Sequence, residues 1–374
     1  MKVVVSCGTP EFLLARQNWL LAEELQKRGH EVTVISGGAR FDLIGEWKGC
    51  AVTTWPSYYP VHLRDFRFGY KLFKKLKPDI VVANFMHVNV AMPTARFAGV
   101  PTRIAWYRHC WPENDIDIKR NFLARNYIKL GKRFALSCAT QLAPVSEVAK
   151  ADAVRVFGVS EEKCRVFNTC RLDPMESING ELPAKPEDHV RIICVGRLVD
   201  IKGHDILIRA AAMMKKATPE LRFKVQIVGG GPRLHDYSAL IRELGVEDTV
   251  DLVGHVDHEE VYTRMAASHV FVLPTRQDAG PGVVGEALSM GLPVMIAEWD
   301  KNIRPLLGGT DAIKLMPVES PEAFAKSLTE FVLDPELRER MSAPSRQTFL
   351  DRFDLKIWIR NAADWFEQLH EANG

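Results

Sequence analysis

The sequence predicts two α/β domains, each a doubly wound parallel sheet covered by helices, that face each other across a cleft. The first observation behind this prediction is an alternation of short apolar runs, rich in Val and Ile, with amphipathic stretches of helical length. The second is a polar, proline-containing stretch at 174–189, after which the alternation restarts. The third is the length of 374 residues, which suits two to three domains of ~100–200 residues. We therefore place the first domain at 1–173, a linker at 174–189 and the second domain at 190–347.

The first domain opens with a βαβ unit. Lys2–Ser6 is predicted to be a buried strand, residues 11–28 an amphipathic helix that ends at Gly29, and Glu31–Ser36 the next strand. Later apolar runs predict four more strands, at Ile80–Asn84, Arg103–Tyr107, Leu142–Ser146 and Cys164–Asn168.

In the second domain, apolar strand patterns and amphipathic helical patterns alternate again and are more clearly separated than in the first. Its predicted strands are Arg191–Val195, Phe223–Val228, Val250–Val253, His269–Leu273 and Pro293–Ala297, and its predicted helices lie at about 204–216, 235–244, 258–267 and 282–290. Ligands of doubly wound sheets bind beyond the carboxyl ends of the strands. The glycine-rich and charged segments that follow these strands are therefore the candidate site.

Composition excludes several classes of protein. Hydrophobic residues make up 47% and charged residues 26%, which excludes a disordered chain. No apolar run approaches the ~18 residues of a membrane span, and the run Val3–Val5 is shorter than a signal-peptide core. The 7 cysteines are scattered, so we expect buried thiols rather than disulfides or a zinc site. Together these features predict a cytoplasmic protein.

The net charge of +2 conceals an asymmetry between the two halves. Residues 1–173 hold 26 Lys and Arg against 16 Asp and Glu, whereas the remainder holds 23 against 31. In the basic half, residues 118–134 are predicted to form an amphipathic helix. It is either an ordinary surface helix with solvated lysines or a peripheral contact with anionic lipid at the cytoplasmic membrane face. No recognisable nucleic-acid-binding module accompanies the charge, so we expect no nucleic-acid partner.

Two cations flank the turn after the predicted strand at 191–195. Gly196-Arg197 and Lys202-Gly203 combine positive side chains with glycines that let backbone approach a ligand, and the next helix adds the positive end of its dipole. This arrangement would neutralise the charge of a diphosphate. The alternative is an Arg and a Lys that are solvated on a turn.

A second group of residues surrounds the predicted helix at 282–290. Gly280 and Gly282 at its start would direct backbone N–H groups at an oxygen-rich ligand. Asp278 precedes the helix and Glu286 lies inside it, and carboxylates accept hydrogen bonds from ribose and sugar hydroxyls. Alternatively Asp278 caps the helix and Glu286 is a surface charge, although the apolar neighbours of Glu286 argue against the latter.

Together these motifs resemble those of the retaining family-4 glycosyltransferases, which have the GT-B architecture of two Rossmann-like domains. The motifs are GRL-x₃-KG at 196–203, VGGGP at 228–232, and D-x₇-E leading into EALSMGLPV at 278–294. The resemblance implies an enzyme that moves a sugar from a UDP- or GDP-hexose to a glycan or lipid-linked glycan, in the assembly of cell-surface polysaccharide or lipopolysaccharide.

The resemblance also implies roles for single residues. Arg197 and Lys202 would bind the diphosphate and stabilise the leaving group, Glu286 would bind the ribose diol, and Asp278 would bind the donor sugar. His109 would face the donor sugar, unless it is a structural histidine. The implied catalytic residues are Arg197, Lys202, His109 and Asp278, the implied acceptor contacts are Gly8 and Thr9, and the implied donor-binding residues are Gly196, Arg197, Lys202, Gly229, His255, Val256, Asp278, Gly280, Pro281, Gly282 and Glu286.

The end of the chain also fits the resemblance. Residues 348–374 are predicted to form one or two amphipathic helices, and in this fold the terminal helix packs back on the first domain. Trp358, Trp365 and Phe366 would then lie at the seam between the domains.

Three positions depart from the family pattern. Asp278 replaces the first glutamate of E-x₇-E, which leaves the identity of the donor sugar open. Residues 7–11 (CGTPE) replace a glycine pair, which leaves the acceptor contacts open. Residues 168–173 (NTCRLD) replace Asn-Gly-Val-Asp, and we expect this change to affect the crossover between the domains more than the chemistry.

The chemistry that the resemblance implies is retention of configuration without a metal. The acceptor would attack on the face from which the leaving group departs and give its proton to the departing phosphate, so the enzyme would act by positioning and by electrostatic stabilisation. We expect no metal and no other cofactor. Asp115-Ile116-Asp117 has the spacing of a metal motif but lies away from the cleft motifs.

Two other functions are compatible with this fold. A nicotinamide- or flavin-dependent oxidoreductase would require Gly-x-Gly-x-x-Gly after a strand, whereas residues 229–234 (GGGPRL) lack the last glycine. A non-catalytic sugar-nucleotide-binding or scaffold protein would keep the fold with an altered site, and Asp278 is the one hint of such a change.

Overall fold

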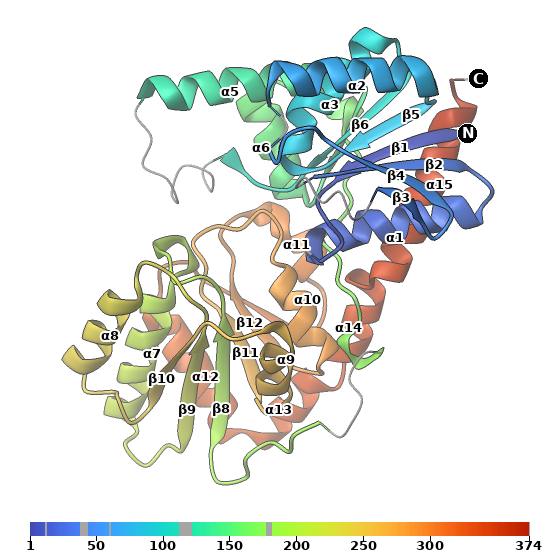
Figure 1. Cartoon of the computed structure of the whole chain (residues 1–374). Helices are drawn as coiled ribbons and strands as arrows, with labels where there is room; N and C mark the ends of the chain where they lie inside the picture. The colour runs from blue at the N-terminus through green and yellow to red at the C-terminus, as the bar shows by residue number, and fades with distance from the viewer. Residues whose placement is uncertain (12, 38–43, 60, 112–121, 177–181, 374) are drawn as a thin grey trace. The chain divides into compact units, whose positions relative to one another are not determined.

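The computed structural model describes residues 1–11, 13–37, 44–59, 61–111, 122–176 and 182–373. The chain folds into two compact units (Figure 1): unit 1 comprises Met1–Asn168 and Leu355–Gly374, and unit 2 comprises Thr169–Asp354. The predicted first boundary at 173 and the predicted helix start at 348 differ from these limits. Asp173 belongs to unit 2, where it is ion-paired with Arg346, and the last helical stretch is interrupted at Phe353 and Asp354.

Unit 1 contains a seven-stranded sheet in the order β3-β4-β2-β1-β5-β6-β7. Its strands are β1 (Lys2–Cys7), β2 (Glu31–Ser36), β3 (Gly45–Trp47), β4 (Cys50–Thr54), β5 (Ile80–Ala83), β6 (Thr102–Tyr107) and β7 (Gln141–Pro144). The strands pair in parallel apart from β3, which is antiparallel to β4. The winding reverses between β1 and β5, which is where doubly wound sheets bind ligands.

The helices of unit 1 are α1 (Leu13–Lys27), α2 (Leu63–Leu76), α3 (Val88–Ala98), α5 (Phe122–Ser137), α6 (Glu147–Phe157) and α15 (Leu355–Glu371). The last of these packs beside α1 although more than 300 residues separate them, as Figure 1 shows in red and blue. Arg28 Nη1 donates to Asp364 Oδ1 at 2.6 Å, which fixes α15 to the end of α1. Trp358 and Trp365 are buried inside unit 1 against Trp106 and Phe167, so these aromatics belong to its core.

Unit 2 contains a parallel six-stranded sheet in the order β10-β9-β8-β11-β12-β13. Its strands are β8 (Val190–Val195), β9 (Phe223–Val228), β10 (Val250–Gly254), β11 (Val270–Leu273), β12 (Val294–Ala297) and β13 (Ile313–Met316). Counted within the unit, this is the 3-2-1-4-5-6 order of dinucleotide-binding sheets, with the reversal between β8 and β11. The carboxyl ends of these two strands are therefore the expected ligand edge.

Helices lie on both faces of the unit 2 sheet. They are α7 (His204–Ala217), α8 (Leu234–Glu243), α9 (His258–Ala266), α10 (Gly282–Ser289), α11 (Arg304–Leu307), α12 (Pro321–Leu333), α13 (Pro335–Ser342) and α14 (Ser345–Arg352). The apolar faces of α7, α8 and α12 share one core with the sheet, while α10 packs against α9 and α14. A parallel sheet with helices packed on both of its faces is the predicted doubly wound architecture, which is thus confirmed.

Most predicted elements are confirmed within a residue or two, but one predicted strand is wrong. Residues 164–168 form a single isolated bridge, between Cys164 and Leu142. The segment still runs beside β7, because the N–H groups of Arg165 and Phe167 donate to the carbonyls of Leu142 and Pro144.

Candidate functional site

The loops that follow β8, β9 and β10 are fixed to one another by backbone contacts. The Gly229 N–H donates to the Gly254 carbonyl at 2.8 Å, and the Leu198 N–H donates to the Gly230 carbonyl at 2.9 Å. Gly229 has φ +145°, and a Cβ built on it would overlap the carbonyl of Gly196. The glycines of VGGGP thus allow the loop after β9 to lie directly on the loop after β8.

The structure brings two of the predicted site residues, Lys202 and Asp278, together. Lys202 Nζ lies 2.6 Å from Asp278 Oδ2, and their side chains are 20% and 14% exposed. The Thr275 hydroxyl donates to the Ile201 carbonyl at 3.0 Å, which holds the loop after β11 against that after β8. Asp278 Oδ1 accepts the Gly280 N–H at 2.9 Å, so the Gly280 amide already has a partner. The alternative that Asp278 caps α10 is wrong, because the residue at the N-cap is Pro281 and no side chain caps this helix.

Arg197 has an exposed side chain and a fixed backbone. The buried His204 donates from Nε2 to the Arg197 carbonyl at 3.0 Å, and its Nδ1 lies 3.4 Å from Cys194 Sγ. Burial lowers the pKa of His204 to about 4, so the ring is neutral near pH 7. Sequence reasoning missed this histidine, although its place directly after Gly203 at the start of α7 was visible.

Glu286 is buried in α10 rather than lying on the surface. Its Oε1 accepts a hydrogen bond from Arg171 Nε at 2.7 Å and lies 3.8 Å from His258 Nε2. Burial raises the pKa of the Tyr262 phenol, and the neighbouring Glu286 carboxylate raises it further. Arg171 belongs to the segment 168–173 that departs from the family pattern, so this segment contacts a predicted donor-binding residue.

The first residue of α10 is covered by Arg171 as well. A Cβ on Gly282 would overlap the guanidinium of Arg171, so this glycine makes room for an arginine. Pro281, the residue before the helix, is buried. After β10, the exposed His255 comes close to Gly230 and is followed by the half-buried Val256.

The predicted residues of unit 1 lie at the carboxyl edge of its sheet. The Gly8 carbonyl accepts from Trp19 Nε1 at 2.9 Å, and the buried Thr9 donates its hydroxyl to Glu11 Oε2 at 3.2 Å. His109 is exposed after β6, with its ring 5.5 Å from that of Phe85. Phe85 has φ +50°, an unusual conformation for a bulky residue and one that concentrates at functional sites.

The described residues form no group of three or more His, Cys, Asp or Glu side chains that could hold a metal ion. Asp115 and Asp117, which have metal-motif spacing, lie outside the described residues, as does part of the predicted linker at 177–181.

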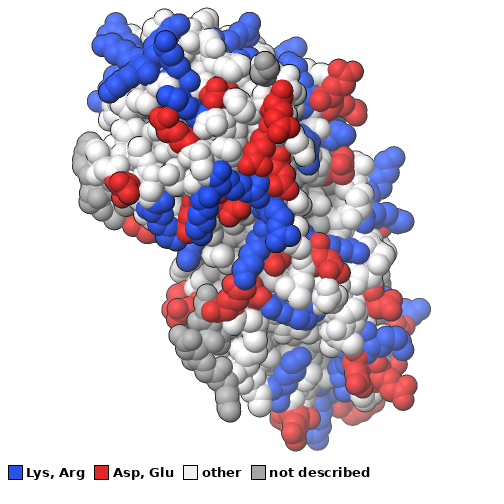
Figure 2. All heavy atoms as spheres, turned by 90° about the vertical axis from the view of Figure 1, so that its right-hand side faces the viewer, with Lys and Arg blue, Asp and Glu red and all other residues white. Residues whose placement is uncertain are grey.

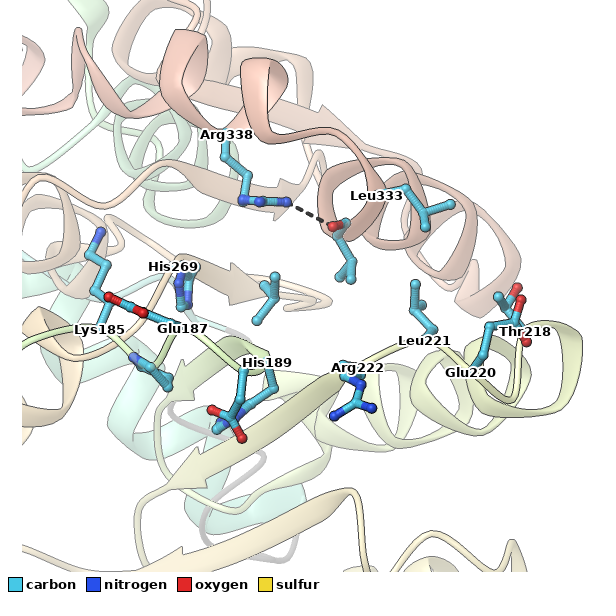
Figure 3. Close-up of a pocket in the computed structure, with 14 residues that line it drawn as sticks. Lys185, Glu187, His189, Thr218, Glu220, Leu221, Arg222, His269, Leu333 and Arg338 are labelled. Atoms are coloured by element: carbon cyan, nitrogen blue, oxygen red, sulfur yellow. Dashed lines mark hydrogen bonds and ion pairs between the residues drawn. The ribbon is translucent and has the colours of Figure 1, made fainter.

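A cavity of about 550 Å³ lies at the opposite, amino end of the unit 2 sheet. Figure 3 shows its mixed lining, with Lys185, His269 and Arg338 on one side and Glu187 beside the lysine. Burial lowers the pKa of His269 to about 4, and its Nδ1 accepts the Arg191 N–H at 3.0 Å. The cavity contains none of the predicted site residues, so it is separate from the candidate site.

The described part of the predicted basic helix is α5, which presents its apolar side to solvent; residues 118–121 lie outside the described residues. Leu123, Tyr127 and Leu130 are 78%, 81% and 69% exposed. The helix carries Arg125, Lys129, Lys132 and Arg133 and no acidic residue. The face drawn in Figure 2, by contrast, intersperses basic and acidic side chains. No helix in the described part of the chain is long and apolar enough to cross a membrane.

Two family models match the chain in succession. The model described as Glycosyltransferase Family 4 matches residues 14–170, and the model described as Glycosyl transferases group 1 matches residues 180–348. The first range contains the strands of the unit 1 sheet apart from β1, and the second contains the six strands of the unit 2 sheet.

Proteins named as sugar transferases are also similar to the chain in sequence. The alpha-D-kanosaminyltransferase of Streptomyces kanamyceticus is 30% identical over 42% of this chain and 40% of its own length. A Campylobacter jejuni protein named N-acetylgalactosamine-N,N'-diacetylbacillosaminyl-diphospho-undecaprenol 4-alpha-N-acetylgalactosaminyltransferase is 27% identical over 72% of this chain and 71% of its own. The chain spans about half the length of several of the relatives that it matches.

A solved structure matches the fold over the whole chain. The sucrose-phosphate synthase of Thermosynechococcus elongatus has a TM-score of 0.74 at 16% identity and is covered completely, as is this chain. At this identity the match bears on the architecture alone.

Proposed function

Since the chain belongs to the family-4 GT-B glycosyltransferases, we propose that it transfers a hexose from a nucleoside diphosphate sugar to a glycan or lipid-linked glycan. The observation that carries this proposal is the convergence of Lys202, Asp278 and the start of α10 at the carboxyl edge of the unit 2 sheet. A cation, a carboxylate and a helix N-terminus at one edge suit the diphosphate and the hydroxyl groups of a nucleotide sugar.

The diphosphate and the sugar of the donor each have a proposed partner in unit 2. Lys202 and Arg197 would neutralise the diphosphate, and Asp278 would accept hydrogen bonds from the sugar. We infer that these two cations stabilise the leaving group without a metal, and that transfer retains the configuration at the anomeric carbon. The acceptor hydroxyl would attack the anomeric carbon on the same face of the sugar from which the diphosphate departs. Its proton would pass to the departing phosphate oxygen.

The acceptor side of the proposal rests on unit 1. Gly8 and Thr9 lie at the carboxyl edge of its sheet, where an acceptor would meet them, and His109, which would face the donor sugar, lies at the same edge. The exposed apolar and basic residues of α5 fit an anionic lipid surface, since apolar side chains can insert among lipid chains while Lys and Arg contact headgroups. We therefore propose peripheral attachment to the cytoplasmic face of a membrane, where a lipid-linked or lipopolysaccharide acceptor would be found.

Calorimetry of the whole chain against UDP, GDP, ADP and dTDP, with and without EDTA, tests the donor site. We expect one nucleotide to bind, with an affinity that EDTA leaves unchanged and that Arg197→Ala lowers by about tenfold or more. No binding at millimolar concentration would overturn the donor-site assignment. Binding without any turnover of the matching nucleotide sugars would instead favour a non-catalytic protein.

Sedimentation with vesicles tests the membrane proposal. We expect binding to vesicles that contain phosphatidylglycerol, little binding to pure phosphatidylcholine, and a loss of about tenfold or more when Leu123, Tyr127 and Leu130 are all replaced by serine. Leu333→Ser in unit 2 is the matched control, because Leu333 is 63% exposed and lies on α12. Equal binding of the triple variant and the wild type would refute attachment through α5.

A further inference from the structure

Arg171 is held in one orientation by several contacts. Its side chain is 12% exposed, and besides Glu286 it contacts the Cys170 carbonyl, to which Nη1 donates at 2.8 Å. Its backbone N–H donates to the Phe353 carbonyl at 2.7 Å. Gly282 leaves space for the guanidinium on the opposite side. The arginine is therefore built into unit 2 rather than resting on its surface.

The two oxygens of the Glu286 carboxylate differ in their partners. Both Arg171 Nε and His258 Nε2 approach Oε1. For Oε2, the described residues provide no hydrogen bond in this structure. A fixed partner on one carboxylate oxygen determines the direction in which the other oxygen points.

We propose that Arg171 is a positioning residue that fixes Glu286 so that Oε2 accepts a hydrogen bond from one ribose hydroxyl of the donor nucleotide. The inference rests on the proposed donor site and deepens it. It assigns the discrimination of ribose from deoxyribose to a pair of residues that lie 115 positions apart in the sequence. An oxygen whose direction is fixed meets one of the two ribose hydroxyls in better hydrogen-bond geometry than the other.

The test compares ribonucleotides with deoxynucleotides in wild type and variants. Calorimetry would measure the affinity of UDP, GDP and ADP and of their 2′-deoxy and 3′-deoxy counterparts. For the nucleotide that binds, we expect the affinity of the wild type to fall by about tenfold or more when one of the two ribose hydroxyls is removed. This is the usual effect of losing a hydrogen bond to a charged group. In Arg171→Lys, which keeps the charge but not the fork of N–H groups, the loss should fall below about threefold.

Gly282→Ala provides an independent route to the same result. Its new methyl group would displace the guanidinium while leaving Arg171 and Glu286 both present, so the discrimination should fall as in Arg171→Lys. Glu286→Gln should abolish the discrimination as well. Arg264→Met is the matched control, because Arg264 is paired with Glu260 on the neighbouring α9 and its loss should leave the discrimination unchanged.

The outcomes separate this inference from a purely structural role. If Arg171→Lys and Gly282→Ala weaken ribonucleotides and deoxynucleotides by the same factor, Arg171 only supports the fold and the inference is wrong. Unchanged discrimination in both variants would also overturn it. If the wild type binds none of the nucleotides, the proposed donor site itself fails, and this inference fails with it.

Discussion

Replacing Lys202 with methionine is expected to lower turnover by about 100- to 1,000-fold, the usual effect of removing one preorganised group from a developing charge. The ammonium lies 2.6 Å from Asp278 in a partly buried pair, where a charge acts more strongly than in water. Without it, the departing diphosphate would lose a counter-charge and would also meet the unpaired carboxylate of Asp278. The measurement is the release of nucleoside diphosphate from the sugar nucleotide whose base binds in calorimetry.

Lys215→Met is the control for this experiment. Lys215 is also paired with an aspartate at 2.6 Å, but it lies in the last turn of α7, at the opposite end of that helix from the loop of Lys202. Its replacement should leave turnover within about twofold and thermal unfolding close to that of the wild type, since exposed pairs contribute little to stability. Turnover of Lys202→Met within threefold of wild type would contradict the leaving-group role.

The architecture was predictable because buried parallel strands appear as continuous apolar runs. Strands β1, β5, β8 and β11 lie in the middle of their sheets, and their residues are buried on both faces. The signal is weaker in some strands at or near the edges. The antiparallel β3 contains exposed residues and the terminal β13 is half-buried in its middle, and both were missed, as was β4 beside the edge.

The convergence of candidate site residues was predictable where they follow a strand within several positions. Lys202 and Asp278 belong to loops after β8 and β11, which are neighbours in the sheet, so the order of strands brings them together. The pairing of Arg171 with Glu286 has no such local signal. It depends on how the segment after Asn168 packs against α10, and this packing is specified by the folded unit rather than by any short motif.

Gly229→Ala is expected to destabilise unit 2 by about 4 kcal/mol, a loss as large as that from a severe core substitution. Two costs add: alanine at φ +145° is strained, and its Cβ would overlap the Gly196 carbonyl. Because the overlapping atom is backbone, relief requires the loop after β8 to move. The midpoint of thermal unfolding should fall by roughly 10 °C, measured by calorimetry of the whole chain.

Gly45→Ala separates the two costs. Gly45 has φ +136°, close to that of Gly229, but a Cβ there would meet no atom of the described residues within 4 Å, so backbone strain is the cost that remains and a loss of about 1 kcal/mol is expected. The difference between the variants therefore measures how firmly the loops after β8 and β9 are packed. Since the Gly196 carbonyl adjoins Arg197, movement of this loop should also weaken nucleotide binding in Gly229→Ala, at temperatures where the protein is still folded. Equal stability losses in the two variants would mean that the loops separate easily and do not form a rigid platform for the diphosphate.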